Sequence, residues 1–254
     1  MTHYTPTAKL FPFIKAYRII ESQEELVNRV LPNTSLALAF RFGGQISYIN
    51  NTGKTNLPVA TFSGLRKTVR LISYEAKTSA LIVLFKETGA TAFLKHPLQE
   101  LFEESVSLDH FFPQSEISIM EERLAEATNN PTRIALVEEY LCSKLTFNKP
   151  DKLVQDAITK IYSNKGIIRM GDLANELYIS LDAFEKRFRK TTGATPKQFS
   201  HIVKMNSIIR QKTPASFLDM AFENGYFDQA HFNKDFKLFT GQTPTDFFKS
   251  DLHW

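Results

Sequence analysis

Apolar and polar positions follow two different periods in the two parts of this chain. The first 112 residues are rich in strand signals, among them a segment whose apolar side chains alternate with a period of two. Ser35 to Phe42 has an apolar residue at every second position, and Gly43-Gly44 offers a turn before Gln45 to Asn50. Thr68 to Tyr74 and Ser79 to Phe85 favour further strands. The pattern predicts a compact β barrel or sandwich.

Helical spacing takes over beyond these strands. Short helices are expected around Thr88 to Leu94 and Pro97 to Glu103. Two longer helices are expected over residues 115–146, because apolar residues recur every three or four positions after Asn130-Pro131. This stripe favours packing on its own domain, and the alternative is a homodimer seam between two copies of the chain. Its members are Ile134, Val137, Leu141 and Leu145.

A polar linker, Asn148-Lys149-Pro150-Asp151, predicts a division into two domains. Residues 1–147 form the β-rich domain and its helical pair, and residues 151–254 form an all-α domain. The fold class is therefore α+β.

The carboxy-terminal domain contains an internal repeat. LANELYISLDAFEKRFRKTTGATPKQF begins at Leu173, and MAFENGYFDQAHFNKDFKLFTGQTPTDF begins at Met220. Ala174 and Ala221 align at an offset of 47, and the residues after the turn align at 48, so the second turn has one more residue. The identical residues of the first copy are Phe184, Lys186, Phe188, Thr192, Gly193, Thr195, Pro196 and Phe199, and those of the second are Phe232, Lys234, Phe236, Thr240, Gly241, Thr243, Pro244 and Phe247.

Each copy predicts two short helices that cross at a tight turn. Ser180 and Asp228 are suitable N-caps for the second helix of each copy, and a phenylalanine pair four residues apart anchors that helix in the core. Gly193 and Gly241 then end these helices as left-handed residues. A Thr-Pro pair starts the next helix in each copy, and a longer helix from Pro196 to Lys212 joins the two units.

The segment AFENGYFDQAHFNKDFKLFTGQTPTDF resembles the signature of the AraC/XylS family of bacterial transcription regulators, over about Val154 to Phe248. The resemblance implies seven helices with two helix-turn-helix units, whose recognition helices enter successive major grooves of double-stranded DNA. It also implies RNA polymerase as a partner, as for an activator. LPNTSLALAFRF, ATFSGLRKTV and LIVLFKETGATAFL resemble the cupin-like domains fused to some of these regulators, which implies a sensing role for the first domain.

The resemblance also identifies candidate DNA contacts on the faces opposite the phenylalanine pairs. Side chains of glutamine, asparagine and lysine read base edges in the major groove, and arginine and lysine also meet phosphates. An ordinary solvated helix surface is the alternative for each residue. Candidates for base contacts are Asp182, Glu185, Lys186, Gln229, Ala230, Asn233 and Lys234, and Ala183 is a further DNA-binding candidate on the same face. Candidates for phosphate contacts are Arg187, Arg189, Lys237 and the helix starts at Thr195 and Thr243.

The first unit departs from the family pattern in its turn and its charge. Tyr178 occupies the position that Gly225 holds in the second unit, and Asp182 and Glu185 stand where neutral or basic residues are commoner. Asp182 could simply pair with Lys186, four residues further on. Ile208 stands where the family tends to have alanine. We therefore expect the second unit to carry most of the base reading.

Charge and composition narrow the function. The 254 residues are 43% hydrophobic, with a net charge of +4 that lies wholly in residues 149–254, where 16 Lys and Arg face 12 Asp and Glu; residues 1–148 hold 15 of each. The chain has no apolar run long enough to span a membrane, and its first residues lack the pattern of a secretory signal. We therefore expect a cytoplasmic protein that does not enter membranes. The single Cys142 excludes an internal disulfide, and the six scattered histidines give no metal site. We expect no cofactor and no enzyme.

Three functions remain to be compared. The first is a DNA-binding regulator controlled by a small-molecule effector or by dimerisation through residues 115–146. The second is an architectural DNA-binding protein without an effector. The third is a DNA-repair methyl acceptor, which would need an activated cysteine, whereas Cys142 has no adjoining cysteine or histidine.

Overall fold

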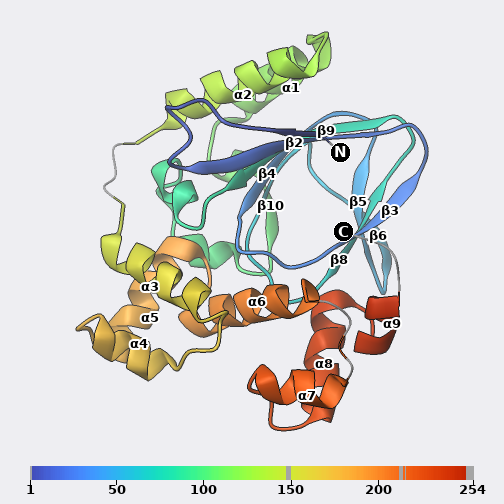
Figure 1. Cartoon of the computed structure of the whole chain (residues 1–254). Helices are drawn as coiled ribbons and strands as arrows, with labels where there is room; N and C mark the ends of the chain where they lie inside the picture. The colour runs from blue at the N-terminus through green and yellow to red at the C-terminus, as the bar shows by residue number, and fades with distance from the viewer. Residues whose placement is uncertain (1, 147–149, 212–213, 215, 250–254) are drawn as a thin grey trace.

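The computed structural model describes residues 2–146, 150–211, 214 and 216–249. Two β-sheets form the amino-terminal part, and most of the helices follow it (Figure 1). The strands are β1 (Thr2–Tyr4), β2 (Ile14–Ser22), β3 (Leu26–Val30), β4 (Ala37–Gly43), β5 (Ile46–Asn50), β6 (Gly53–Asn56), β7 (Ala60–Ser63), β8 (Arg70–Tyr74), β9 (Thr78–Phe85) and β10 (Ser105–Ser107). The helices are η1 (Gly89–Ala92), η2 (Leu98–Leu101), η3 (Leu108–His110), α1 (Gln114–Glu126), α2 (Asn130–Lys144), α3 (Lys152–Ser163), α4 (Met170–Glu176), α5 (Leu181–Thr192), α6 (Pro196–Ile209), α7 (Phe217–Glu223), α8 (Gln229–Thr240) and α9 (Pro244–Lys249).

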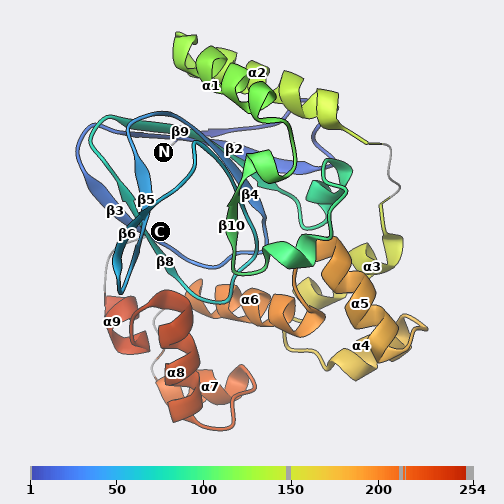
Figure 2. The same ribbon diagram turned by 180° about the vertical axis from the view of Figure 1, so that it is seen from behind.

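The β-rich part is an antiparallel pair of sheets. Sheet A has the strand order β1-β2-β9-β4-β7-β10, and sheet B has the order β3-β8-β5-β6. Helices α1 and α2 lie along one side of these sheets, and α3 to α9 lie on the opposite side, as both views show (Figures 1 and 2). The β-rich first part and the seven-helix second part predicted from the sequence are both confirmed within the described residues.

The main hydrophobic core lies outside sheet A, between that sheet and the helices. Phe40 of β4 meets Tyr140 of α2 edge to face, with ring centroids 6.1 Å apart. Leu38, Phe62 and Val83 are fully buried in the same core. Alternate residues of a strand point to opposite faces, so the predicted apolar face of Ser35 to Phe42 packs against helices and not against the second sheet.

A smaller apolar cluster joins the facing surfaces of the two sheets. Ile20 and Ala80 of sheet A are buried with Ile46 and Tyr74 of sheet B. Because this cluster is small, polar side chains occupy much of the remaining inner surface. Burial raises the pKa of the Tyr74 hydroxyl to about 12, as expected for a phenol held away from water.

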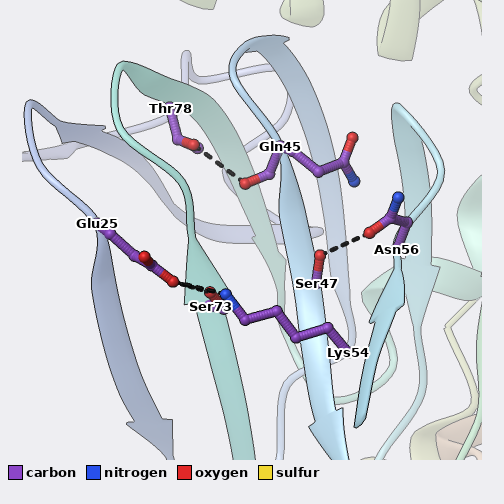
Figure 3. Close-up of polar contacts among 7 residues, drawn as sticks. All are labelled: Glu25, Gln45, Ser47, Lys54, Asn56, Ser73 and Thr78. Carbon is purple, nitrogen blue, oxygen red and sulfur yellow. Dashed lines mark hydrogen bonds and ion pairs between the residues drawn. The ribbon is translucent and has the colours of Figure 1, made fainter.

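The outer face of sheet B is covered by polar side chains (Figure 3). Lys54 of β6 reaches across the sheet to Glu25, beside β3, with 2.5 Å between Nζ and Oε1. Ser47 donates to Asn56 at 2.9 Å on this face, and beside the start of β5 the buried Thr78 hydroxyl of sheet A donates to the Gln45 carbonyl at 3.1 Å. The outer face of this sheet is therefore polar, as expected of an antiparallel sheet that meets water on one side.

The α-helical part contacts the β-rich part directly. The Tyr162 hydroxyl of α3 lies 2.7 Å from the Thr34 hydroxyl and donates to Glu87 at 2.6 Å. Asn206 of α6 donates to the Pro32 carbonyl at 3.1 Å. One contiguous apolar core includes residues from both parts. Residues 148 and 149 of the predicted linker lie outside the described residues, and its last residue, Asp151, caps α3.

Several elements differ from the sequence expectation. The short helices expected near residues 88–94 and 97–103 are single 3-10 turns, η1 and η2. The strands β1, β2, β3, β6, β7 and β10 were not predicted. In β2 the buried positions do not alternate strictly, because the strand shifts register between Ile14 and Ala16, and β6 is exposed throughout. Neither pattern carries a period of two.

Gly64 provides a test of how the β7–β8 loop packs. A Cβ atom at Gly64 would lie 1.8 Å from the Leu101 carbonyl oxygen, so the backbone must shift to accept a side chain. We expect Gly64→Ala to lower the free energy of unfolding by more than about 2 kcal/mol, as overpacking does. Gly171→Ala is the control, because a Cβ there meets nothing within 4 Å and alanine favours a helix. Urea denaturation of both variants checks this, and equal stability would contradict the packing.

Candidate nucleic-acid interface

The first helix-turn-helix unit consists of α4 and α5, packed beneath α3. The Ser180 hydroxyl caps α5 by accepting the Ala183 amide hydrogen, as predicted. Phe184 and Phe188 are fully buried, and their rings meet at 5.7 Å. The helix ends at Gly193, whose φ of +86° is left-handed. Local sequence thus fixes both ends of α5 and the face that it buries.

The second unit repeats this construction in α7 and α8. Asp228 caps α8 by accepting from the His231 amide, and Phe232 and Phe236 are fully buried. Gly241 ends the helix with a φ of +78°. The predicted caps, anchors and left-handed ends are therefore confirmed in both units.

The two turns share a backbone conformation despite their different residues. Gly225 has a φ of +73°, and Tyr178 has a φ of +55°. The Tyr178 side chain is 98% exposed, so no packing compensates for the unfavourable left-handed backbone. The extra residue of the second turn, Phe227, is 88% exposed. The departure noticed in the sequence is therefore a site of backbone strain.

Helix α6 joins the two units. Thr195 caps it with a reciprocal pair of hydrogen bonds, because its hydroxyl accepts from the Gln198 amide and its own amide donates to the Gln198 side chain. Pro196 follows at the first helical position, as predicted. Ile208, the departure from the family's alanine, is fully buried. Figure 1 shows α6 running between the two groups of helices.

Asp235 connects α8 to α6 and to the turn of the second unit. Its Oδ2 atom lies 2.9 Å from His201 Nε2 and accepts a hydrogen bond from the Tyr226 hydroxyl at 2.8 Å. The Lys204 ammonium lies 3.7 Å from the centre of the Tyr226 ring. Burial alone would raise the pKa of the Asp235 carboxyl, but the hydrogen bonds and charge of His201, with Tyr226 and Lys204, lower it.

Most of the predicted DNA contacts lie on the surface. Asp182, Ala183, Lys186, Arg189, Ala230, Asn233, Lys234 and Lys237 are exposed, and Glu185 and Gln229 are half-buried. No ion pair joins Asp182 to Lys186 among the described residues, so the alternative of mutual pairing is not seen. These side chains are placed on the two helices as the repeat predicted.

Three other predicted contacts already have partners within the chain. Arg187 Nε donates to Asp151 Oδ2 at 2.6 Å, which ties α5 to the start of α3, and this bond raises the Arg187 pKa. The Thr195 hydroxyl and amide are used by the cap of α6. The Thr243 hydroxyl donates to Asp246 at 2.6 Å and accepts from its amide. These residues have a structural role whatever they contact in a complex.

Both recognition helices rest on the β-rich part at their carboxyl ends. A Cβ atom at Gly193 would lie 3.0 Å from the Leu98 carbonyl oxygen, and one at Gly241 would lie 3.2 Å from Val69 Cγ1. The Val69 amide also donates to the Leu238 carbonyl at 3.3 Å. Equivalent glycines of the two repeats therefore make equivalent contacts, and the amino-terminal turns of α5 and α8 stay exposed.

The structure adds cations that sequence reasoning did not identify. Arg169, Lys197 and Lys204 line a hollow of about 420 Å³ beside the amino-terminal half of α6. Lys204 is half-buried, and burial lowers its pKa. The basic excess of the second half was the only signal for this group, because Arg169 precedes α4 whereas Lys197 and Lys204 lie on α6. They add positive charge between the two units.

Comparisons with known proteins agree with this geometry. Residues 173–250 match the model of a family described as a helix-turn-helix domain, and residues 2–107 match a domain of unknown function, DUF6597. The Msm operon regulatory protein of Streptococcus mutans serotype c is 28% identical over 120 residues. That match covers 45% of this chain and 43% of the relative, so it spans less than half of either protein.

Two solved structures are also similar in part. ToxT from Vibrio cholerae, with an unsaturated fatty acid bound, has 10% identity and a TM-score of 0.47, with 97% of each chain covered. The AraC-like transcriptional activator CuxR has 12% identity and a TM-score of 0.26, covering 81% of this chain and 84% of that one.

The repeated caps, aromatic anchors and left-handed glycines, together with the family match, define a tandem helix-turn-helix domain. Residues 173–250 of this chain are therefore a helix-turn-helix domain, and the chain is similar over part of its length to a bacterial regulatory protein. No helix within the described residues is long and apolar enough to cross a membrane.

The strained turn of the first unit gives a stability prediction. Tyr178→Gly should raise the free energy of unfolding by up to about 1 kcal/mol, because glycine adopts a left-handed conformation without steric cost while adding some entropy to the unfolded chain. Gly225→Ala should lower it by about 1 kcal/mol, because the added Cβ has room but the backbone does not suit it. Urea unfolding of both variants checks this. A destabilised Tyr178→Gly would show that the tyrosine has a compensating contact.

The Asp235 cluster gives a pH prediction. A carboxyl whose folded pKa is lowered stabilises the fold above its unfolded pKa, about 3.9, and loses that contribution as the pH falls through the folded value. We expect Asp235→Asn to cost roughly 1–2 kcal/mol at pH 7 and progressively less in acid. Glu223→Gln, on the exposed end of α7, is the control and should change little at either pH. Urea titrations from pH 7 downward measure both, and a constant deficit for Asp235→Asn would refute the linkage.

Proposed function

We propose that this chain is a sequence-specific regulator of transcription that binds double-stranded DNA through α5 and α8. The proposal places the two recognition helices in successive major grooves, one helical turn of about 34 Å apart. The proposal divides the chain into a β-rich sensing or dimerisation domain over residues 1–147 and a DNA-binding domain over residues 151–254. The chain acts by binding, with RNA polymerase as a partner, and not as an enzyme.

The seating of the two recognition helices is the observation that supports the proposal most directly. Helix-turn-helix proteins contact bases with the amino-terminal residues of the recognition helix. In this chain Gly193 and Gly241 hold the opposite ends against the β-rich part, which leaves Asp182 and Ala230 in solvent and Gln229 half-buried. The amino-terminal turn of each recognition helix is thus open to contact with a duplex.

The two units should contribute unequally. Gln229, Asn233 and Lys234 of α8 can pair with adenine and guanine edges, whereas α5 offers Asp182 and Glu185, which repel phosphates. The second unit should therefore carry most of the base discrimination. The first unit, stiffened by the Arg187–Asp151 pair, should mainly fix the orientation.

The β-rich domain is the proposed effector or dimerisation domain, with a cupin-like role. A dimer through α1 and α2 has limited apolar surface available, because Ile134, Val137 and Leu141 are buried within the chain. Ile119 of α1, 56% exposed, would be the apolar residue at such a contact.

Two other functions are less well supported. An architectural DNA-binding protein would use the same helices without an effector, and a ligand that stabilises the folded protein separates the two, since only a sensor has one. A methyl acceptor would need an accessible, activated thiolate. Cys142 is half-buried on α2 and packs against the main core, which favours a packing role.

Two substitutions distinguish base contacts from phosphate contacts. Gln229→Ala should reduce the preference for the specific duplex over a scrambled one by roughly 1–3 kcal/mol and leave the salt dependence unchanged. Arg189→Ala should weaken binding to both duplexes equally and reduce the slope of log affinity against log salt by about one. Arg123→Ala, on α1 outside the interface, is the control. Equal losses on both duplexes for Gln229→Ala would contradict its assigned role.

A further inference from the structure

The inner faces of the two sheets carry an unusual number of arginines. Tyr17 of β2 donates to Glu138 on α2, so Arg18, the next residue, points to the opposite face, toward sheet B. Phe40 packs on α2, and Arg41 likewise points inward. Arg70 of β8 lies 4.5 Å from the centre of the Tyr48 ring, and Arg66, in the loop after β7, shares that ring at 5.6 Å. Four cations thus face the space between the sheets.

Arg66 is buried without an acidic partner. Its residue is 7% exposed, and Nη2 donates to the hydroxyls of Ser105 at 3.2 Å and Tyr48 at 3.4 Å. Its Nη1 is shielded from water and has no hydrogen-bond acceptor. A buried guanidinium whose donors are unfilled destabilises the fold unless an anion or acceptor compensates. Arg66 Nη1 therefore remains a buried hydrogen-bond donor without an acceptor, and an anion beside it would compensate the positive charge.

Two half-buried arginines of the inner face each have one unfilled donor as well, although Arg41 Nη1 donates to the Gly44 carbonyl. The Nε atoms of Arg18 and Arg41 are also shielded from water and have no acceptor. Burial lowers the pKa of Arg66 and of Arg18, as expected for cations that desolvation disfavours. Burial would raise the pKa of Tyr48, but the charge of Arg66 and the hydroxyl hydrogen bonds lower it, which reflects a positive potential there.

Acidic side chains do not balance these cations at the strand positions that face inward. By strand alternation, none of those positions in β2, β4, β5, β7, β8, β9 or β10 is Asp or Glu within the part of the chain that the structure describes. The Glu103 carboxylate offsets part of the Arg66 charge from the adjoining loop, where it accepts from the Lys67 amide. The inner surface is therefore electropositive.

The inner surface also has room near these cations. Ala37 and Ala39 have small side chains, and both residues are partly exposed, although β4 is flanked by strands on both sides. The Ser63 and Ser105 hydroxyls, 2.8 Å apart on paired strands, add donors beside Tyr48.

We propose that the space between the two sheets binds a small organic oxyanion, a carboxylate or a phosphate ester, with Arg66 as its principal partner. Guanidinium groups pair with both oxyanions through parallel hydrogen bonds, and the Tyr48 and Ser105 hydroxyls lie beside Arg66 as further donors. Arg18 and Arg41 face the same space and would extend the recognition of a larger ligand. This names a ligand class for the proposed effector domain.

The site is connected to both recognition helices through short segments. Arg66 and Val69 belong to the same loop, and Val69 contacts Leu238 and Gly241 at the end of α8. Arg70 donates to the Glu103 carbonyl, and the residues just before Glu103 form η2, which meets Gly193 at the end of α5. An anion at Arg66 should therefore alter how firmly both helices are seated, an effect on DNA affinity that rests on the proposed function.

Thermal unfolding of the full chain in sodium acetate, sodium phosphate and sodium chloride at matched ionic strength tests the site without DNA. A ligand that binds the folded state raises Tm with its concentration. We expect acetate, phosphate or both to raise Tm above the chloride value, and the larger rise identifies the carboxylate or the phosphate class. Arg66→Met should abolish this rise, and Arg123→Met, which removes the same charge from the surface of α1, should keep it.

Arg66→Lys is a second variant that keeps the test decisive if Arg66→Met does not fold. It retains the charge but not the planar fork, so its response to the oxyanion should shift to at least about tenfold higher concentration. The site is refuted if neither oxyanion exceeds chloride on the wild-type protein, or if an Arg66 variant responds like Arg123→Met. A separate experiment measures the affinity for the specific duplex with and without the oxyanion. If the oxyanion raises Tm but the protein does not bind DNA, the oxyanion site stands and the proposed function is rejected.

Discussion

The close approach of two glycines to the β-rich part is the constraint on which the arrangement of this protein depends. Gly193 and Gly241 each end a recognition helix in a left-handed conformation, and each lies against a residue of the first domain. A side chain at either position would meet both a backbone penalty and a steric one. The same residue type thus ends the helix and sets its distance from the other domain.

These glycine contacts, together with α6, hold the two helix-turn-helix units of the carboxy-terminal domain in a fixed arrangement. Helix α6 joins them covalently, and Asp235 ties α8 to α6 through His201 and Tyr226. The first domain then contacts both units at corresponding points, η2 for one and Val69 for the other. A change in the first domain can therefore reach both helices at once, a geometry suited to control of DNA binding.

The β-rich domain has its main apolar core on an unexpected side. Phe40 and Val83 pack outward against α1, α2 and the neighbouring segments, whereas the inner surface between the sheets is lined partly by arginine. A sheet that turns its apolar face outward to helices is free to keep a polar interior. Packing of the helices on the outer face of sheet A thus stabilises the fold, and the space between the sheets remains available for the proposed ligand.

The sequence by itself determined the second domain almost completely. Its caps, its phenylalanine pairs and its left-handed glycines are local features that repeat, so the alignment of two copies predicted both helix ends and the buried face. The strained Tyr178 was also visible there as a tyrosine aligned with Gly225. Such features need no distant partner, because each acts within one or two turns of helix.

Only the tertiary structure decided which contacts join the two domains and what lies between the sheets. Strands such as β2 and β6 lack an alternating pattern, so neither their pairing nor the inward direction of Arg18 could be inferred. Arg66 stands in a loop, and its burial depends on Tyr48 and Ser105, which come from strands far apart in the sequence. Long-range pairing places these residues together, and local pattern carries no record of it.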